Sequence, residues 1–140
     1  MKGIDYETRD QSEVDRESSM NPEIKKKWLE ALRSGQYAQT KERLRDDSGY
    51  CCLGVLCDLY AKEKNVEWEK SVNAYGTNRY RFYNASGELP ELVVQWAGVG
   101  NHDPILSDAN DEHESETCSW ANDNGGLSFA EIADRIEKAL

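Results

Sequence analysis

The sequence predicts an α+β fold, with about four helices around a central helix rich in cysteine and leucine and with a small antiparallel sheet. Apolar residues recur at helical spacing in four segments, and two short aromatic-rich stretches alternate in the manner of strands. The chain has 140 residues, the length of one domain, which we expect to span residues 20–140. Residues 1–19 hold three basic and six acidic residues and few core-forming side chains, which predicts a flexible acidic arm.

The first predicted helix follows Asn21, a good N-cap, and Pro22, which suits the first helical position. Gly35 is expected to end it. Residues 36–49 are predicted to form a short strand or loop. The apolar face of the helix consists of Ile24, Trp28, Ala31 and Leu32.

The central helix is predicted in the run Tyr50-Cys-Cys-Leu-Gly-Val-Leu-Cys-Asp-Leu-Tyr60. It is apolar on most sides, so we expect other elements to surround it. Gly54 within it costs about 1 kcal/mol of helix stability relative to alanine, which indicates that another backbone or a ligand lies very close. The four cysteines of the chain are expected to be reduced, buried thiols.

The remaining elements are shorter. Residues 66–68 and 80–83 are predicted strands, and residues 104–106 a brief one. A helix is predicted from Pro90 to about Ala97, with Leu89, Leu92, Val93 and Trp96 facing inward and Gly98 closing it. A turn at 122–126 precedes the last helix, which opens with a capping box formed by Ser128 and Glu131.

Charge is segregated along the chain. Between Lys25 and Arg45, seven basic and two acidic residues give +5, whereas the whole chain carries −10. The net charge argues against DNA or RNA binding, but the basic segment suits a small anionic ligand. No apolar run approaches the ~20 residues of a membrane helix, and the N-terminus lacks the apolar core of a signal peptide, so we expect a cytoplasmic protein without membrane contact.

The basic segment supplies the first candidate site. In a strand, Arg43 and Arg45 would point the same way as Gln39 and Lys41, and arginine forks suit phosphate or carboxylate. The alternative is a solvated edge strand whose arginines pair with acidic residues elsewhere.

Other residues near this segment complete the prediction. Gln39 would read the edge of a base, and Trp28 or Tyr37 would offer a face for stacking. Arg33, from the same segment, is a further candidate cation.

A second candidate cluster combines arginines with aromatic residues. In a strand, Arg79 and Arg81 would share a face, with Tyr80 and Phe82 on the other. Such interleaving can neutralise phosphates and stack bases. The alternative is an ordinary strand with one buried aromatic face.

Metal binding and catalysis are weakly supported. His102, His113 and Cys118 match no compact zinc pattern, and the acidic run 108–114 lacks EF-hand spacing. No nucleophile, metalloprotease or phosphate-loop motif is present. We therefore expect no cofactor and no enzymatic activity.

Several segments together resemble a widespread family of small phage-encoded proteins, over roughly residues 20–140. The motifs are Trp28-xx-Ala-Leu-Arg-Ser-Gly-x-Tyr37-x-Gln39, Leu44-Arg45, the cysteine run from Tyr50, Leu89-Pro90, Val94-x-Trp96-Ala-Gly98, Asn122-Asp123 and Ser128-Phe-x-Glu-Ile-Ala-Asp134. The family is similar to anti-CBASS proteins that act as sponges for the cyclic nucleotide signals of bacterial immunity. The resemblance implies anti-defence activity in the cytoplasm of an infected bacterium.

The leading hypothesis is therefore a non-enzymatic binder of a cyclic di- or oligonucleotide such as cGAMP. Nanomolar capture requires roughly 12 kcal/mol, which a small chain reaches more easily at a subunit interface, so we expect a dimer or tetramer. The alternatives are an inhibitor that presents an acidic surface, residues 103–117 above all, to a basic host protein, and an enzyme that cleaves a nucleotide signal.

Overall fold

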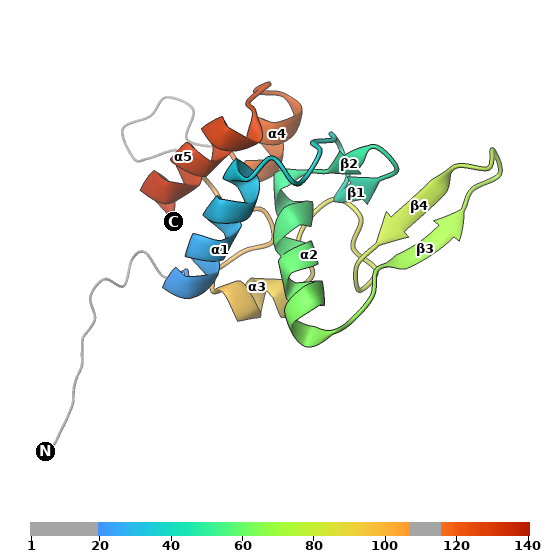
Figure 1. Cartoon of the computed structure of the whole chain (residues 1–140), viewed down its shortest axis with the longest axis horizontal. Helices are drawn as coiled ribbons and strands as arrows, with labels where there is room; N and C mark the ends of the chain where they lie inside the picture. Colours follow the sequence, from blue (N-terminus) through green and yellow to red (C-terminus); the bar gives the residue numbers. More distant parts are fainter. Residues whose placement is uncertain (1–19, 107–115) are drawn as a thin grey trace, which may run out of the picture.

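The computed structural model describes residues 20–106 and 116–140. These residues form five helices and two antiparallel two-stranded sheets, which confirms the α+β class. Helix α2 (Cys52–Lys64) lies centrally and contacts α1 (Pro22–Arg33), α3 (Glu91–Ala97) and α4 (Cys118–Asp123), while α5 (Phe129–Ala139) packs on α1 (Figure 1). The predicted arm, residues 1–19, lies outside the described residues.

The helix boundaries follow from capping chemistry. The Asn21 side chain accepts hydrogen bonds from the backbone N–H groups of Glu23 and Ile24, at 2.9 and 3.2 Å. At α5, Ser128 and Glu131 form the predicted capping box. Helix α4 was not predicted, because six residues are too few to show a helical period. The predicted turn at 122–126 overlaps only its last two residues.

Helix α2 is buried along most of its length, as its composition predicts. A Cβ added to Gly54 would lie 1.8 Å from the carbonyl oxygen of Leu44, so a second backbone does lie against this glycine. All four cysteines are free and buried, which confirms the prediction for the thiols. Burial raises the pKa of Cys51 and of Cys57, so neither is an activated nucleophile.

The two sheets lie on one side of the helices. Strands β1 (Arg45–Asp46) and β2 (Gly49–Tyr50) form a tight hairpin, and β3 (Glu69–Val72) pairs with β4 (Asn78–Arg81) in a second hairpin that projects away from the helices (Figure 1). The register places Glu69 opposite Arg81 and Lys70 opposite Tyr80. The predicted strands at 66–68 and 80–83 are therefore displaced in the structure.

The early end of β4 has a backbone cause. Tyr83 and Asn84 have φ angles of +50° and +70°, which end the extended conformation after β4. Phe82 is nevertheless buried, as predicted, and packs against Trp68 at 4.9 Å between ring centroids.

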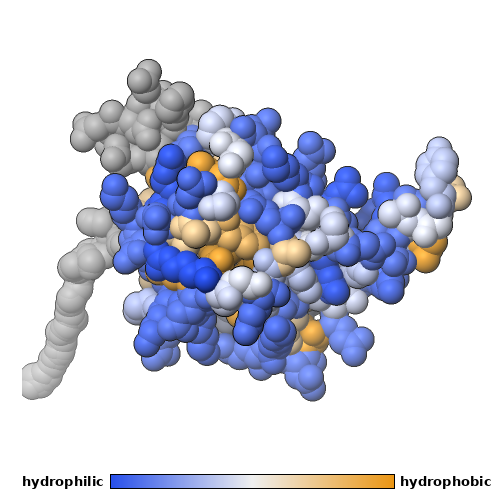
Figure 2. All heavy atoms as spheres, turned by 45° about the horizontal axis from the view of Figure 1, so that its top comes forward, coloured by the Kyte–Doolittle hydropathy of each residue, from blue (hydrophilic) through white to orange (hydrophobic). Residues whose placement is uncertain are grey.

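Smaller differences concern the surface. Leu92 is 47% exposed and does not face inward, because Val93, Val94 and Ala97 form the buried face of α3. The brief strand at 104–106 is a single bridge between Ile105 and Thr117. The face shown in Figure 2 is mostly hydrophilic, with an apolar patch near its middle and smaller apolar spots elsewhere. No helix in the described ranges is long and apolar enough to cross a bilayer.

Candidate functional site

A pocket of about 210 Å³ forms between β1, β4 and the segment before β1. We call it the arginine pocket. It brings together two candidate clusters that lie more than thirty residues apart in the sequence. Its lining residues are Glu42, Arg43, Arg45, Asn78, Arg79, Tyr80, Arg81 and Ser86.

The arginine pocket is strongly cationic. Four arginines and one glutamate line it, which gives a formal charge of 4 − 1 = +3. None of these arginines forms an ion pair with a residue that the structure describes. Arginines that line one pocket without carboxylate partners repel one another, and an anion that binds there relieves this repulsion.

The backbone around Leu44 holds two of the arginines in place. Leu44 is fully buried, its N–H donates to the carbonyl oxygen of Ser86 at 2.7 Å, and its own carbonyl oxygen accepts from the N–H of Cys51 at 3.0 Å. Arg43 and Arg45 flank this anchored residue. The positions of both arginines therefore depend on how closely Leu44 lies against α2.

The prediction that Gln39, Lys41, Arg43 and Arg45 share one face of a strand is wrong. Glu42 has a φ of +70°, and its N–H donates to the Asp123 carboxylate at 2.9 Å, so the chain turns sharply before Arg43. Of the four predicted donors, Arg43 and Arg45 line the arginine pocket, whereas Gln39 and Lys41 do not.

Aromatic rings surround the guanidinium group of Arg45. Its central carbon lies 4.4 Å from the ring centroid of Tyr80, 5.0 Å from that of Tyr50 and 5.4 Å from that of Trp68. Such cation–π contacts orient an arginine while leaving its N–H donors available. Arg45 is thus held in position before any ligand arrives.

Hydrogen bonds to Asp47 connect the β3–β4 hairpin to the β1–β2 turn. The Tyr80 hydroxyl donates to the Asp47 carboxylate at 2.9 Å, and the side-chain amide of Asn78 donates to it at 3.0 Å. These hydrogen bonds lower the pKa of Asp47. They hold the face of β4 that carries Asn78 and Tyr80 against this turn, whereas Arg79 and Arg81 alternate with these residues along the strand and are exposed.

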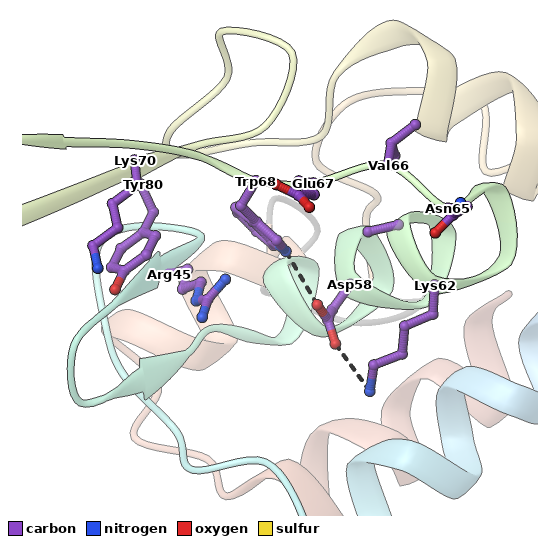
Figure 3. A pocket seen from close by; sticks show the side chains of 10 residues that line it. Arg45, Asp58, Lys62, Asn65, Val66, Glu67, Trp68, Lys70 and Tyr80 are labelled. Atoms are coloured by element: carbon purple, nitrogen blue, oxygen red, sulfur yellow. Dashed lines mark hydrogen bonds and ion pairs between the residues drawn. The ribbon is translucent and has the colours of Figure 1, made fainter.

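A larger cavity of about 440 Å³ adjoins the arginine pocket and shares Arg45 and Tyr80 with it (Figure 3). We call it the Trp68 cavity. Its further lining residues are Asp58, Ala61, Lys62, Asn65, Val66, Glu67, Trp68 and Lys70.

The carboxylate of Asp58 is fully engaged. It is 8% exposed, and it accepts hydrogen bonds from the Trp68 indole N–H at 3.1 Å and from the Tyr37 hydroxyl at 2.7 Å. The Lys62 ammonium lies 3.3 Å away (Figure 3). Asp58 therefore orients the wall of the Trp68 cavity and has little capacity left for a ligand.

Neither predicted stacking residue lines these cavities. Trp28 is fully buried, and its indole N–H donates to the carbonyl oxygen of Cys52 at 2.9 Å, so its assignment as a stacking face is wrong. Tyr37 packs edge-on against Tyr50. Burial and the bond to Asp58 raise the pKa of Tyr37 to about 12. The aromatic walls come instead from Trp68 and Tyr80, of which only Tyr80 was in a predicted cluster.

The other predicted polar residues have structural partners or lie elsewhere. The Gln39 amide donates to Asn122 and to the carbonyl oxygen of Leu127, both at 2.9 Å, so it is not available to read a base. Arg33 joins α1 to α5 through ion pairs with Asp134 and Glu137, at 2.7 and 2.8 Å. Lys41 is exposed and lines neither cavity.

Comparison with known proteins places the chain in a family. Residues 20–140 match the family described as a domain of unknown function, DUF8296. The chain belongs to this family. No curated protein and no solved structure matches this DUF8296 protein. Within residues 20–106 and 116–140, no group of three or more histidine, cysteine or acidic side chains is arranged to hold a metal ion. The candidate ligands in 107–115, His113 included, lie outside the described residues.

The main residue that sequence reasoning missed in this DUF8296 chain is Asn122, which is fully buried. Its side-chain oxygen accepts from Gln39 and from the N–H of Cys52, and its amide donates to the carbonyl oxygen of Thr40 at 2.8 Å. It therefore ties α4 to the start of α2 and to the segment that leads to the arginine pocket. In the sequence, Asn122 and Asp123 were noted only as part of the family resemblance. Hydrophobic periodicity does not indicate that a single asparagine will be buried.

Replacing Asn122 with alanine is expected to lower the free energy of unfolding by about 2–4 kcal/mol, because it leaves buried donors and acceptors without partners. Urea denaturation followed by tryptophan fluorescence measures the change. Asn124→Ala is the matched control, since Asn124 is exposed, and it should stay within about 0.5 kcal/mol of the unmodified protein. Equal stability of both variants would contradict the role given to Asn122.

Proposed function

We propose that this protein binds a cyclic nucleotide immune signal, such as a cyclic dinucleotide, and sequesters it without cleaving it. The observation that carries the proposal is the arginine pocket, where four arginines without ion-pair partners among the described residues adjoin an aromatic-walled cavity. A cyclic dinucleotide combines anionic phosphates with flat bases. The proposal extends the phage resemblance to an anti-defence role in the cytoplasm of an infected bacterium.

In this proposal, the phosphates of the ligand bind in the arginine pocket and the rest of the ligand extends into the Trp68 cavity. Arg43, Arg79 and Arg81 donate to phosphate oxygens in the arginine pocket, and Arg45 contributes from the shared wall. The Trp68 cavity, at about 440 Å³, is a shallow depression that is open to solvent, so it offers the base a wall and leaves one side of it uncovered.

Capture fits the chemistry of the arginine pocket better than cleavage does. Phosphodiester hydrolysis needs a general base or a metal-activated water beside the phosphate. The arginine pocket offers guanidinium donors together with Asn78, Tyr80, Ser86 and a single carboxylate, Glu42. Fixed guanidinium groups stabilise the bound anion and supply no attacking group.

Tight capture also favours assembly. Nanomolar affinity requires roughly 12 kcal/mol, and an open pocket of about 210 Å³ encloses only part of a cyclic dinucleotide. We therefore propose a dimer or tetramer in which a second subunit covers the ligand. Light scattering coupled to size-exclusion chromatography, with and without ligand, measures the assembly.

The direct test is a thermal-shift screen of cyclic di- and trinucleotides and cyclic ADP-ribose isomers, followed by mass spectrometry of the recovered ligand. One class should shift the unfolding temperature by several degrees and be recovered intact, since a ligand in large excess over its Kd adds several kcal/mol of stability. A flat panel with folded protein would reject capture and favour the acidic inhibitor, which a pull-down from host lysate examines. Recovery of cleaved product would reject sequestration.

A further inference from the structure

We propose that the Trp68 cavity is a nucleobase subsite in which Glu67 selects guanine. This inference rests on the proposed function, because it assigns the base of a ligand whose phosphate lies in the arginine pocket. The two spaces share Arg45 and Tyr80, so a phosphate and its attached base can occupy them together.

The Trp68 cavity is less cationic than the arginine pocket, so the phosphate belongs in the arginine pocket. Arg45, Lys62 and Lys70 oppose Asp58 and Glu67 in the Trp68 cavity, a formal charge of 3 − 2 = +1, whereas the arginine pocket has +3. A carboxylate without a partner repels phosphate and attracts groups that carry N–H donors. Trp68 and Tyr80 supply aromatic surface of the kind that bases prefer, and Arg45, which lies over part of both rings, offers its guanidinium plane for stacking as well.

The two carboxylates of the Trp68 cavity differ in their free capacity. Asp58 is occupied by Tyr37, Trp68 and Lys62. Glu67 is exposed, lies next to Trp68 in the chain (Figure 3), and forms no side-chain hydrogen bond or ion pair with any described residue. Both of its oxygens are thus open to a ligand. Asn65, also exposed, can donate or accept and so does not discriminate between bases.

A carboxylate distinguishes the purines by their Watson–Crick edges. Guanine presents two adjacent donors, N1–H and the N2 amino group, which match the two oxygens of Glu67. Adenine presents one donor beside the N1 lone pair, which faces the carboxylate unfavourably. A glutamine at the same place offers one donor and one acceptor, which pair with O6 and N1–H of guanine as well as with N1 and the N6 amino group of adenine, so it does not discriminate between the two purines.

Isothermal titration with cyclic di-GMP and cyclic di-AMP tests the inference. The unmodified protein should bind cyclic di-GMP about 10- to 100-fold more tightly than cyclic di-AMP, the discrimination expected from a bidentate contact. Glu67→Gln should weaken cyclic di-GMP binding by a similar factor and bring its affinity close to that for cyclic di-AMP, so that the preference is lost. Glu30→Gln is the matched control, because Glu30 is an exposed glutamate on α1 outside both cavities, and it should leave both affinities unchanged.

The outcomes separate the inference from the function on which it rests. Equal affinities in the unmodified protein, or a preference that Glu67→Gln leaves unchanged, would overturn the role of Glu67 while cyclic nucleotide capture stands. Failure of the unmodified protein to bind any cyclic nucleotide would overturn the proposed function and the subsite together.

Discussion

Replacing Arg43 and Arg79 together with alanine is expected to weaken cyclic nucleotide binding by about a hundredfold to ten-thousandfold. Each arginine supplies a charge-assisted hydrogen bond to phosphate, worth about 1.5–3 kcal/mol. Arg43 comes from the segment before β1 and Arg79 from β4, so the variant removes donors from both sides of the arginine pocket. Isothermal titration with the ligand identified by the thermal-shift screen measures the loss.

The fold should tolerate this double variant. Both side chains are exposed and form no ion pair with a described residue, so the free energy of unfolding should change by less than about 1 kcal/mol. The matched control is Lys26→Ala with Lys138→Ala, which removes two exposed cations outside both cavities and should leave affinity nearly unchanged. A folded Arg43/Arg79 variant that still binds within threefold of the unmodified protein would refute the assignment of the arginine pocket.

The sequence indicated which residues are cationic and aromatic, but it did not predict how the structure brings them together. Alternation placed Arg79 and Arg81 on one face of a strand, and both are exposed on β4. Nothing local indicated that β4 would meet the segment carrying Arg43, because this contact joins residues far apart in the chain. Tertiary folding therefore creates the arginine pocket from two clusters that the sequence shows separately.

The incorrect site residues have a common physical cause. Trp28 falls on the apolar face of α1, and that periodicity predicts burial in the core more strongly than it predicts a role in stacking. Gln39 was predicted to face a ligand from a strand and to read the edge of a base, but its amide donates to the buried Asn122. A polar side chain that completes an interior network has the same sequence signature as one that binds a ligand.

Helix ends were predictable because capping depends on a few neighbouring residues. Asn21 and the pair Ser128 and Glu131 act as their sequence positions predict. Strand boundaries were not, because the chain leaves the extended conformation at the positive φ angle of Tyr83, a residue type that rarely adopts it. Glycine gave the most specific tertiary prediction, since Gly54 inside α2 indicated a close backbone that proved to be Leu44.

Replacing Gly54 with alanine is expected to lower the free energy of unfolding by about 4–5 kcal/mol. Two effects of opposite sign compete at this position. Alanine favours the helix by about 1 kcal/mol relative to glycine. The new Cβ, however, would lie 1.8 Å from the Leu44 carbonyl oxygen and 2.8 Å from its carbonyl carbon, and both atoms belong to the backbone. Relief requires α2 and the segment before β1 to separate, which also breaks the hydrogen bond from Cys51 to Leu44.

Urea denaturation of Gly54→Ala, with Gly87→Ala as the control, measures the free energy of unfolding and shows whether the clash with Leu44 outweighs the gain in helix propensity. A Cβ at Gly87 meets nothing within 4 Å, so this control should stay within about 0.5 kcal/mol of the unmodified protein. Because Leu44 sits between Arg43 and Arg45, Gly54→Ala that remains folded should also bind the cyclic nucleotide more weakly. A Gly54→Ala protein as stable as the unmodified one would mean that α2 and Leu44 can separate at little cost, and the close approach would then not be what holds the two arginines in place.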